Sequence, residues 1–261
     1  MIVNERHSQS LAGRLLTALL SLSQNIVLRA VDIYNHVISY IKLSTYHYTM
    51  NTLSNDFYWL HHGPIERREL EIVGSGTDRD LSQRGKLVAC HFARAIEQAL
   101  LSQSITSPDI ILSSPMKRTR QTAEIIASVN NLDVQVVADL RAQNFGALEG
   151  RTIEDIRTDP NLRPYLYENI PSGERFFSQP PDGESQYQTM VRTERLRSIL
   201  LEGGDTRPLV ITHGTVLNHV IGSIIGTGWA DRDDINKSHT NQMIVDNGRD
   251  TLRTINLGDI K

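Results

Sequence analysis

The sequence predicts an α/β domain in which strands alternate with helices. From Phe57 onwards, short apolar runs alternate with amphipathic helical patterns, and glycine, proline or serine separates many of them. This alternation is typical of strands that are joined by crossover helices. Two of the apolar runs also end in the same dipeptide, histidine followed by glycine, at 62–63 and 213–214.

The first half of this domain is expected to contain three strands and two helices. Ser82 stands where an N-cap is needed, and Pro108 precedes the second apolar run. A serine hydroxyl can accept a hydrogen bond from the first turn of a helix, so Ser82 indicates a helix start. The expected elements are a strand at 57–61, a helix at 82–100, a strand at 109–112, a helix at 119–129 and a strand at 133–137.

The second half begins with an irregular segment. Residues 157–184 contain five of the nine prolines, which predicts an excursion without regular structure. Helical periodicity then resumes, and Asn247-Gly248 is a typical hairpin turn. The expected elements are a helix at 185–201, a strand at 209–212, a helix at 216–225 and a hairpin formed by 242–245 and 251–257.

The first fifty residues differ from the rest of the chain. Seven apolar residues between Leu15 and Ile41 recur at helical spacing and predict one long amphipathic helix or two shorter ones. The longest uncharged run has 14 residues and includes polar side chains, so it is too short and too polar to span a bilayer. We therefore expect an N-terminal helical extension at 1–50 and a folded domain at 51–261. We expect this extension to pack on its own domain or on a second subunit to form a homodimer, unless Met50 is the translation start.

Composition excludes several classes of protein. The 261 residues are 39% hydrophobic and 22% charged, which is typical of a globular chain. Lys and Arg number 27 against 30 Asp and Glu, so no overall positive field attracts nucleic acid or an anionic membrane. Cys90 is the single cysteine, which excludes an internal disulfide framework and agrees with a reducing compartment. We expect a cytoplasmic protein without a nucleic-acid partner.

The two histidine-glycine pairs indicate a site. Ligands of open α/β sheets bind beyond the carboxyl ends of the strands, so His62 and His213 lie in one crevice if their strands are neighbours. Glycine after each histidine lets the chain turn sharply and lets a ligand approach closely. A neutral imidazole can attack phosphorus and leave again, which divides one displacement into two easier steps.

A basic run begins the helix that is expected between these two strands. It follows the turn 113–115 and contains Lys117, Arg118 and Arg120. Cations are unfavourable in the first turn of a helix because its dipole is positive there. We interpret the run as part of a site for a bound anion, since cationic donors stabilise the oxygens of a phosphoryl group during transfer.

Six segments carry a family resemblance. They are His62-Gly63, D-R-D-L-S-Q-R-G at 78–85, S-P-M-K-R-T-R-Q-T-A at 114–123, F-G-A-L-E-G at 145–150, D-G-E-S at 182–185 and T-H-G at 212–214. In this combination and order the chain resembles the histidine phosphatase superfamily, also called the phosphoglycerate mutase-like family. The resemblance extends from Phe57 to Leu257.

This resemblance implies a three-layer α/β/α sandwich at 51–261. Proteins of this family transfer phosphoryl groups through a phosphohistidine and need no metal or other cofactor. By the same likeness His62 is the nucleophile, Arg118 is a phosphate clamp and His213 holds the phosphoryl oxygens. The implied partner is a small phosphorylated substrate.

The sequence departs from the family pattern at three positions. The arginine that usually precedes the nucleophile is replaced by His61, whose imidazole is only partly charged near neutral pH. The usual glutamate general acid is replaced by Ala142. Another branch of the family has aspartate directly after the second histidine, where this chain has Gly214. One permanent charge and the usual proton donors are therefore missing.

Replacement charges are present nearby. Glu66, Arg67 and Arg68 follow the turn after the nucleophile, where family members often carry polar substrate contacts. We take Arg68, with His61 and Arg118, as a candidate substrate-binding residue. The alternative is that these side chains are exposed charges on a loop.

The departures from the family pattern at His61, Ala142 and Gly214 restrict the substrates that we expect. A general acid matters most for a poor leaving group such as an alkoxide, because a stable anion departs without a proton. We therefore expect a metal-independent phosphatase that acts on a diphosphate, an acyl phosphate or a phosphohistidine. The alternative is a weak or inactive pseudophosphatase that binds a phosphorylated ligand or serves as a scaffold. A phosphoglycerate mutase is less favoured, because it also needs the missing acid.

Overall fold

The computed structural model describes residues 56–66, 73–74, 78–203, 206–226, 241–248 and 251–258. The helical extension predicted at 1–50 lies outside these residues, and so does Arg68. Within the described part of the chain, no helix is both long enough and apolar enough to cross a membrane.

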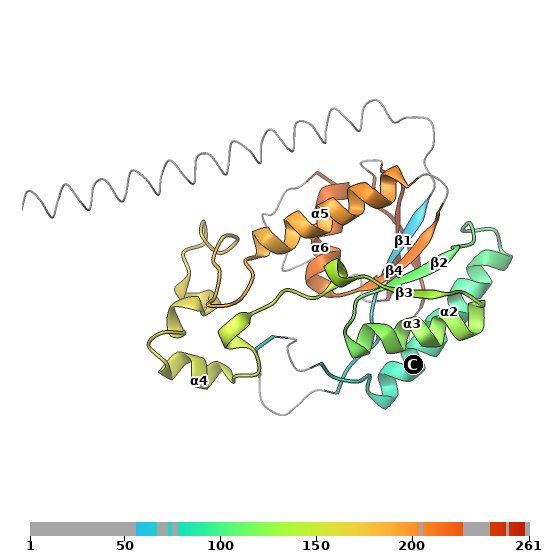
Figure 1. Cartoon of the computed structure of the whole chain (residues 1–261). Helices are drawn as coiled ribbons and strands as arrows, with labels where there is room; N and C mark the ends of the chain where they lie inside the picture. The colour runs from blue at the N-terminus through green and yellow to red at the C-terminus, as the bar shows by residue number, and fades with distance from the viewer. Residues whose placement is uncertain are drawn as a thin grey trace, which may run out of the picture. The chain divides into compact units, whose positions relative to one another are not determined.

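A mixed sheet forms the centre of the fold (Figure 1). Its strand order is β3-β2-β4-β1-β5-β6 in the described residues, with β3, β2, β4 and β1 parallel and the last two strands antiparallel to their neighbours. The strands are β1 (Phe57–His61), β2 (Ile110–Ser113), β3 (Val134–Val136), β4 (Pro208–Thr212), β5 (Gln242–Asp246) and β6 (Arg253–Asn256). The predicted closing hairpin is confirmed by the pairing of β5 with β6.

Helices cover both faces of the sheet. Figure 1 shows α2 (Gln83–Leu101) and α3 (Lys117–Asn130) on one side, and α5 (Gln186–Glu202) and α6 (Gly214–Ile224) on the other. Alternate residues of β1 enter the two cores, since Tyr58 and Leu60 pack in one cluster and Phe57 and Trp59 in the other. This alternation follows from the strand geometry, in which successive side chains point to opposite faces. The predicted three-layer α/β/α sandwich is confirmed.

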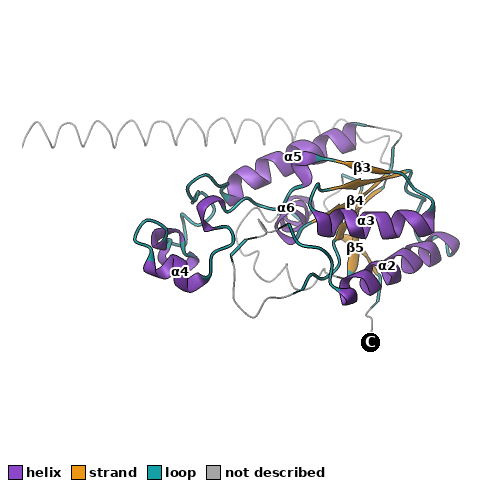
Figure 2. Cartoon of the chain, turned by 60° about the horizontal axis from the view of Figure 1, so that its bottom comes forward, coloured by secondary structure: helices purple, strands orange, loops and turns teal. Residues whose placement is uncertain are grey.

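The segment after β3 contains a helix that the sequence analysis missed. α4 (Ile153–Thr158) is only six residues long, too short for a clear periodicity, but Thr152 and Asp155 form a capping box at its start. The rest of the proline-rich excursion contains two single 3-10 turns. Apolar side chains of α4 and of the excursion pack with Leu148, Phe145 and Val73 in a small separate core, and Figure 2 shows α4 well away from the sheet.

The start of α3 also differs from the prediction. The helix begins at Lys117 rather than at Thr119, and its N-cap position, Met116, provides no side-chain hydrogen bond. The Lys117 N–H instead donates to Oδ1 of Asp78, at 2.6 Å. A carboxylate from a distant segment therefore caps the helix, so the local sequence offers no side-chain N-cap at this boundary.

A buried ion pair joins α5 to the sheet. The Arg197 guanidinium donates to both carboxylate oxygens of Asp246, at 2.7 and 2.9 Å, and Nε1 of Trp59 donates to the same carboxylate. The side chains of Arg197 and Asp246 are 5% and 0% exposed. Removing one member leaves an uncompensated charge in the core, so the pair is a structural requirement.

We predict that Arg197→Ala lowers the free energy of unfolding by about 3–5 kcal/mol, because Asp246 then remains buried without its partner. Urea unfolding followed by circular dichroism measures this change. Arg207→Ala is the control, since Arg207 and Asp109 form a more exposed pair, and the expected loss is about 1 kcal/mol or less. Equal losses in the two variants would contradict the buried role.

Candidate active site

Two histidines meet at the carboxyl ends of neighbouring parallel strands. β1 and β4 pair so that His61 lies opposite Thr212, and the His62 N–H donates to the Thr212 carbonyl at 3.1 Å. The ring centres of His62 and His213 are 5.2 Å apart. The sheet therefore brings together two imidazoles that are far apart in the sequence.

Arg118 lies between these imidazoles. Its Nε donates to Nε2 of His62 and one of its terminal nitrogens, Nη2, lies against Nδ1 of His213, both at 3.1 Å. A guanidinium can only donate hydrogen bonds, so both ring nitrogens must present lone pairs. Arg118 is 3% exposed, and burial lowers its pKa although Asp78 and Glu149 counteract this effect. It remains cationic at every accessible pH.

The hydrogen bonds of His62 define its tautomer. Nε2 accepts from Arg118, so the ring proton lies on Nδ1, which donates to the Gly63 carbonyl at 2.7 Å. Burial holds the pKa of His62 well below its usual value, and repulsion from His61 and His213 in their protonated forms and from Arg118 lowers it further. His62 is therefore a neutral imidazole whose Nε2 lone pair is held beside a cation.

His213 is fixed in the opposite tautomer. Its Nδ1 accepts from Arg118, so its Nε2 carries the proton and donates to Oγ of Ser114 at 2.9 Å. Burial, followed by the charge of Arg118, lowers the pKa of His213 well below its usual value. Ser114 is fully buried, and the sequence marks it only as the first residue of the 114–123 motif. Its role in orienting His213 could not be inferred from the motif alone.

His61 lies beside His62. Its ring centre is 4.2 Å from that of His62, and its Nδ1 donates to the His62 carbonyl at 2.7 Å. Burial lowers the pKa of His61, the hydrogen bond to the His62 carbonyl opposes this effect, and the charge of Arg118 lowers the pKa further. At neutral pH this position therefore supplies an uncharged imidazole.

Glycine is required after His62 because of close backbone packing. A Cβ on Gly63 would lie 2.6 Å from the Gly85 carbonyl oxygen, and one on Gly85 would lie 1.9 Å from that of Pro64. The Gly63 N–H donates to Oγ1 of Thr122, one turn after Arg118 on α3. We expected Gly63 to admit a ligand, but its close neighbour is the first turn of α2.

These residues line a cleft of about 330 Å³. The described lining combines arginines, histidines and other polar groups with a few apolar side chains, and it includes no carboxylate. It consists of His61, His62, Ile65, Gly74, Arg79, Arg118, Ala142, Gln143, Phe145, His213, Gly214 and Thr215. Of the predicted site residues, His61, His62, Arg118 and His213 are therefore brought together, and Arg68 lies outside the described residues. Arg79 is an addition that sequence reasoning missed, because it occupies a variable position of the 78–85 motif.

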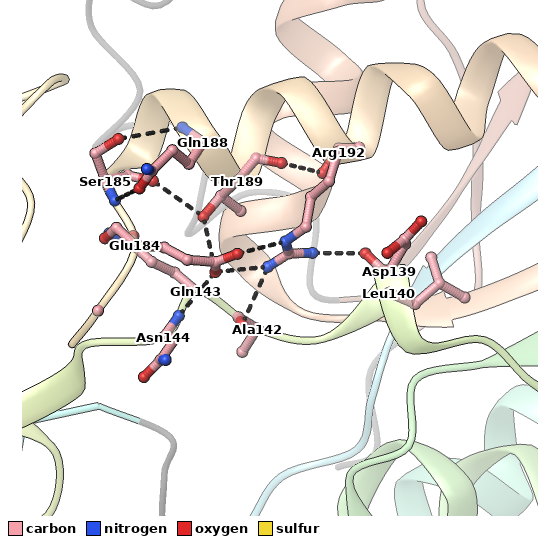
Figure 3. A network of polar contacts seen from close by, with 12 residues as sticks. Asp139, Leu140, Ala142, Gln143, Asn144, Glu184, Ser185, Gln188, Thr189 and Arg192 are labelled. Carbon is pink, nitrogen blue, oxygen red and sulfur yellow. Dashed lines mark hydrogen bonds and ion pairs between the residues drawn. The ribbon is translucent and has the colours of Figure 1, made fainter.

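A polar network fixes the segment that carries Ala142 (Figure 3). Arg192 donates to both carboxylate oxygens of Glu184, at 3.0 and 3.1 Å, and to the carbonyls of Asp139 and Ala142. Burial alone would raise the pKa of Glu184, but hydrogen bonds from Arg192 and the Asn144 N–H lower it below its usual value. Glu184 thus serves as a charged structural anchor and is not available as a proton donor.

Glu149 also has a structural role, because its carboxylate binds the backbone at Phe145. Its Oε1 accepts the Phe145 N–H at 2.9 Å, and a Cβ on Gly74 would lie 2.3 Å from its Oε2. Neither glutamate lines the cleft. In the described part of the chain, no group of three histidine, cysteine, aspartate or glutamate side chains is arranged to hold a metal ion.

Comparison with known proteins decides the family. The sequence pattern of the histidine phosphatase superfamily, branch 1, matches residues 57–259. The chain belongs to the histidine phosphatase superfamily. Its curated relatives include "Probable phosphoglycerate mutase GpmB" of Photorhabdus laumondii, 31% identical over 174 residues, or 65% of this chain and 74% of the relative. The same name is carried by a protein of Escherichia fergusonii, 29% identical over 67% of this chain and 77% of that protein.

Solved structures share this superfamily fold. The alpha-ribazole phosphatase of Shigella flexneri has a TM-score of 0.63 at 20% identity, covering 77% of this chain and 96% of that one. A phosphoserine phosphatase mutant of Entamoeba histolytica, in complex with phosphoserine, has a TM-score of 0.59 at 22% identity, with coverages of 76% and 94%. Membership of the superfamily supports an enzyme of the phosphatase or mutase kind.

We predict that anion affinity rises as the pH falls from 8 to 5. Burial favours neutral His61, a bound dianion favours its imidazolium, and binding therefore takes up a proton. Sulfate is the probe because it stays a dianion throughout this range, and calorimetry measures its affinity. His61→Arg should flatten the profile and strengthen binding at pH 8 by about 10- to 100-fold, the value of a charged hydrogen bond.

His61→Gln separates His61 from its neighbours in this experiment. Glutamine is neutral at every pH, so this variant should bind weakly with a flat profile. If sulfate affinity depends on pH in His61→Gln as it does in the wild-type protein, then His62 or His213 takes up the proton and His61 is not part of the anion site.

Proposed function

We propose that this protein is a metal-independent phosphatase that acts through a phosphohistidine on His62. The observation that carries the proposal is the neutral Nε2 of His62, which Arg118 holds at the cleft beside His213. Nucleophilic catalysis needs an unprotonated nitrogen, and phosphoryl transfer needs fixed cations around the phosphoryl oxygens. Arg118 meets both needs with one side chain.

In the first step, the Nε2 lone pair of His62 attacks phosphorus. The bond between phosphorus and the leaving oxygen breaks, and its electron pair stays with that oxygen. Nδ1 keeps its proton and its hydrogen bond to the Gly63 carbonyl, so the phosphorylated ring is an imidazolium. Arg118 turns from the imidazole lone pairs to the phosphoryl oxygens, where charge spreads in the transition state.

In the second step, water attacks phosphorus and the P–N bond returns its electron pair to Nε2. The imidazolium is a good leaving group because it departs as neutral His62. Both protons of the water remain on the phosphate that is released, so this step needs no separate proton acceptor. The cycle ends with His62 in the tautomer that the hydrogen bonds to Arg118 and Gly63 define.

The cleft favours substrates with a stable anionic or neutral leaving group. Ala142 occupies the position of the family acid, and no carboxylate lines the cleft among the described residues. A general acid contributes about 10²–10⁴ in rate, mainly when an alkoxide has to leave. We therefore propose a diphosphate, an acyl phosphate or a phosphohistidine as substrate.

The nucleophile is tested by phosphoryl labelling. Incubation with ³²P-labelled acetyl phosphate or diphosphate should give an acid-labile, base-stable label on the wild-type protein, and His62→Ala should give no label and no turnover. His61→Ala should keep measurable activity, because it removes only a flanking imidazole. His91→Ala is the control, since Nε2 of His91 bonds to the Leu257 carbonyl outside the cleft. Label that persists in His62→Ala would overturn the assignment.

The missing acid is tested at Ala142. We predict that Ala142→Glu raises hydrolysis of glycerol phosphate, relative to nitrophenyl phosphate, at least about 10-fold, because a carboxylic acid then protonates the alkoxide. Ala142→Gln has nearly the same shape without the acid and should leave the ratio unchanged. The comparison measures kcat/KM for both substrates. A wild-type protein that cleaves both equally well would argue against the absence of a working acid.

The second candidate is a pseudophosphatase that binds a phosphorylated ligand. It is favoured by the same two positions, since His61 and Ala142 replace a charge and an acid. The labelling experiment separates the candidates. Sulfate binding without any phosphoenzyme from good donors is the outcome expected of the pseudophosphatase.

A further inference from the structure

Arg79 enters the cleft from a segment that is tied to α3 on both sides. Oδ1 of Asp78 accepts the Lys117 N–H at 2.6 Å, and Oδ1 of Asp80 accepts from Nε2 of Gln121 at 2.7 Å. The Leu81 N–H donates to Oε1 of the same Gln121 at 2.7 Å. The backbone of Arg79 is therefore held over the first turn of the helix that carries Arg118.

The two arginines have different places in the site. Arg118 is buried, with its hydrogen bonds directed at the two imidazoles, whereas Arg79 is partly exposed and lines the same cleft. Burial is the main cause that lowers the pKa of Arg118, and the nearby charge of Arg79 lowers it further. Two cations that line one cleft, whose described lining includes no carboxylate, fit a ligand with more than one anionic group.

We propose that Arg79 binds the leaving group of the reaction and thereby selects substrates whose leaving group is itself an anion, diphosphates foremost. Arg118 and the histidines hold the transferred phosphoryl group, and Arg79 holds the second phosphate. This inference rests on the proposed phosphohistidine mechanism and narrows its substrate class. A phosphohistidine substrate is then disfavoured, because its imidazole leaves without negative charge.

Arg79 offsets the negative charge that develops on the leaving group in the first step. When Nε2 of His62 attacks, the electron pair of the breaking P–O bond adds one negative charge to the departing phosphate. A carboxylic acid at the position of Ala142 would remove that charge by protonation. The Arg79 guanidinium offsets it electrostatically, so no proton has to be transferred and no co-reactant is needed.

The test compares three phosphoryl donors on Arg79→Gln. Inorganic diphosphate and acetyl phosphate have anionic leaving groups, and phosphoimidazole has a neutral one. For inorganic diphosphate, kcat/KM should fall about 10- to 100-fold. This loss does not exceed the usual effect of removing one charge-stabilising donor, because Arg79 is partly exposed and solvent screens its charge. Acetyl phosphate should lose less, and phosphoimidazole should change by less than about 3-fold. Arg79→Lys should restore most of the diphosphate activity, since it keeps the charge.

Arg84→Gln is the matched control. It removes a positive charge five residues later, on an exposed site of α2 that does not line the cleft, and should leave all three activities unchanged. Equal losses for diphosphate and phosphoimidazole in Arg79→Gln would overturn the proposal. The proposed function would survive that result if His62 still carries the label, and it would fail separately if no donor labels His62.

Discussion

The site depends on one buried cation shared by two imidazoles. Because the Arg118 guanidinium can only donate, it forces a lone pair onto Nε2 of His62 and onto Nδ1 of His213. The second nitrogen of each ring must then carry the proton, and the Gly63 carbonyl and Ser114 hydroxyl are placed to accept it. One arginine therefore fixes the tautomer, orientation and charge of both histidines before any ligand arrives.

This arrangement leaves Arg118 without a hydrogen-bonded carboxylate among the described residues. Arg118 is 3% exposed, and its nearest hydrogen-bond partners are neutral rings and the sulfur of Met116 rather than a carboxylate. A buried charge without a direct counter-ion is unfavourable, and a phosphoryl group in the cleft would supply the missing negative charge. Replacement of the usual arginine by His61 lowers the fixed positive charge at one side, and Arg79 adds charge at another. The described lining therefore carries its permanent positive charge on Arg118 and Arg79.

The loops around the cleft are held by polar contacts from distant segments rather than by their own periodicity. The Glu184–Arg192 pair fixes the backbone at Ala142, and Asp78 caps the helix that carries Arg118. Each contact satisfies backbone groups that a loop cannot pair internally. Such anchors let an irregular chain present side chains with the precision that phosphoryl transfer requires.

The sequence by itself determined the order of the main helices and strands, because period and turn residues are local properties. It also determined which residue types were available, so His61, His62, Arg118, His213 and the substitution at Ala142 could be named without coordinates. Only the tertiary structure decided that β1 and β4 are neighbours, that Asp78 rather than a local cap starts α3, and that Arg79 reaches the cleft. These facts depend on contacts between residues far apart in the chain, and neither helical periodicity nor a short motif records which distant segment approaches which.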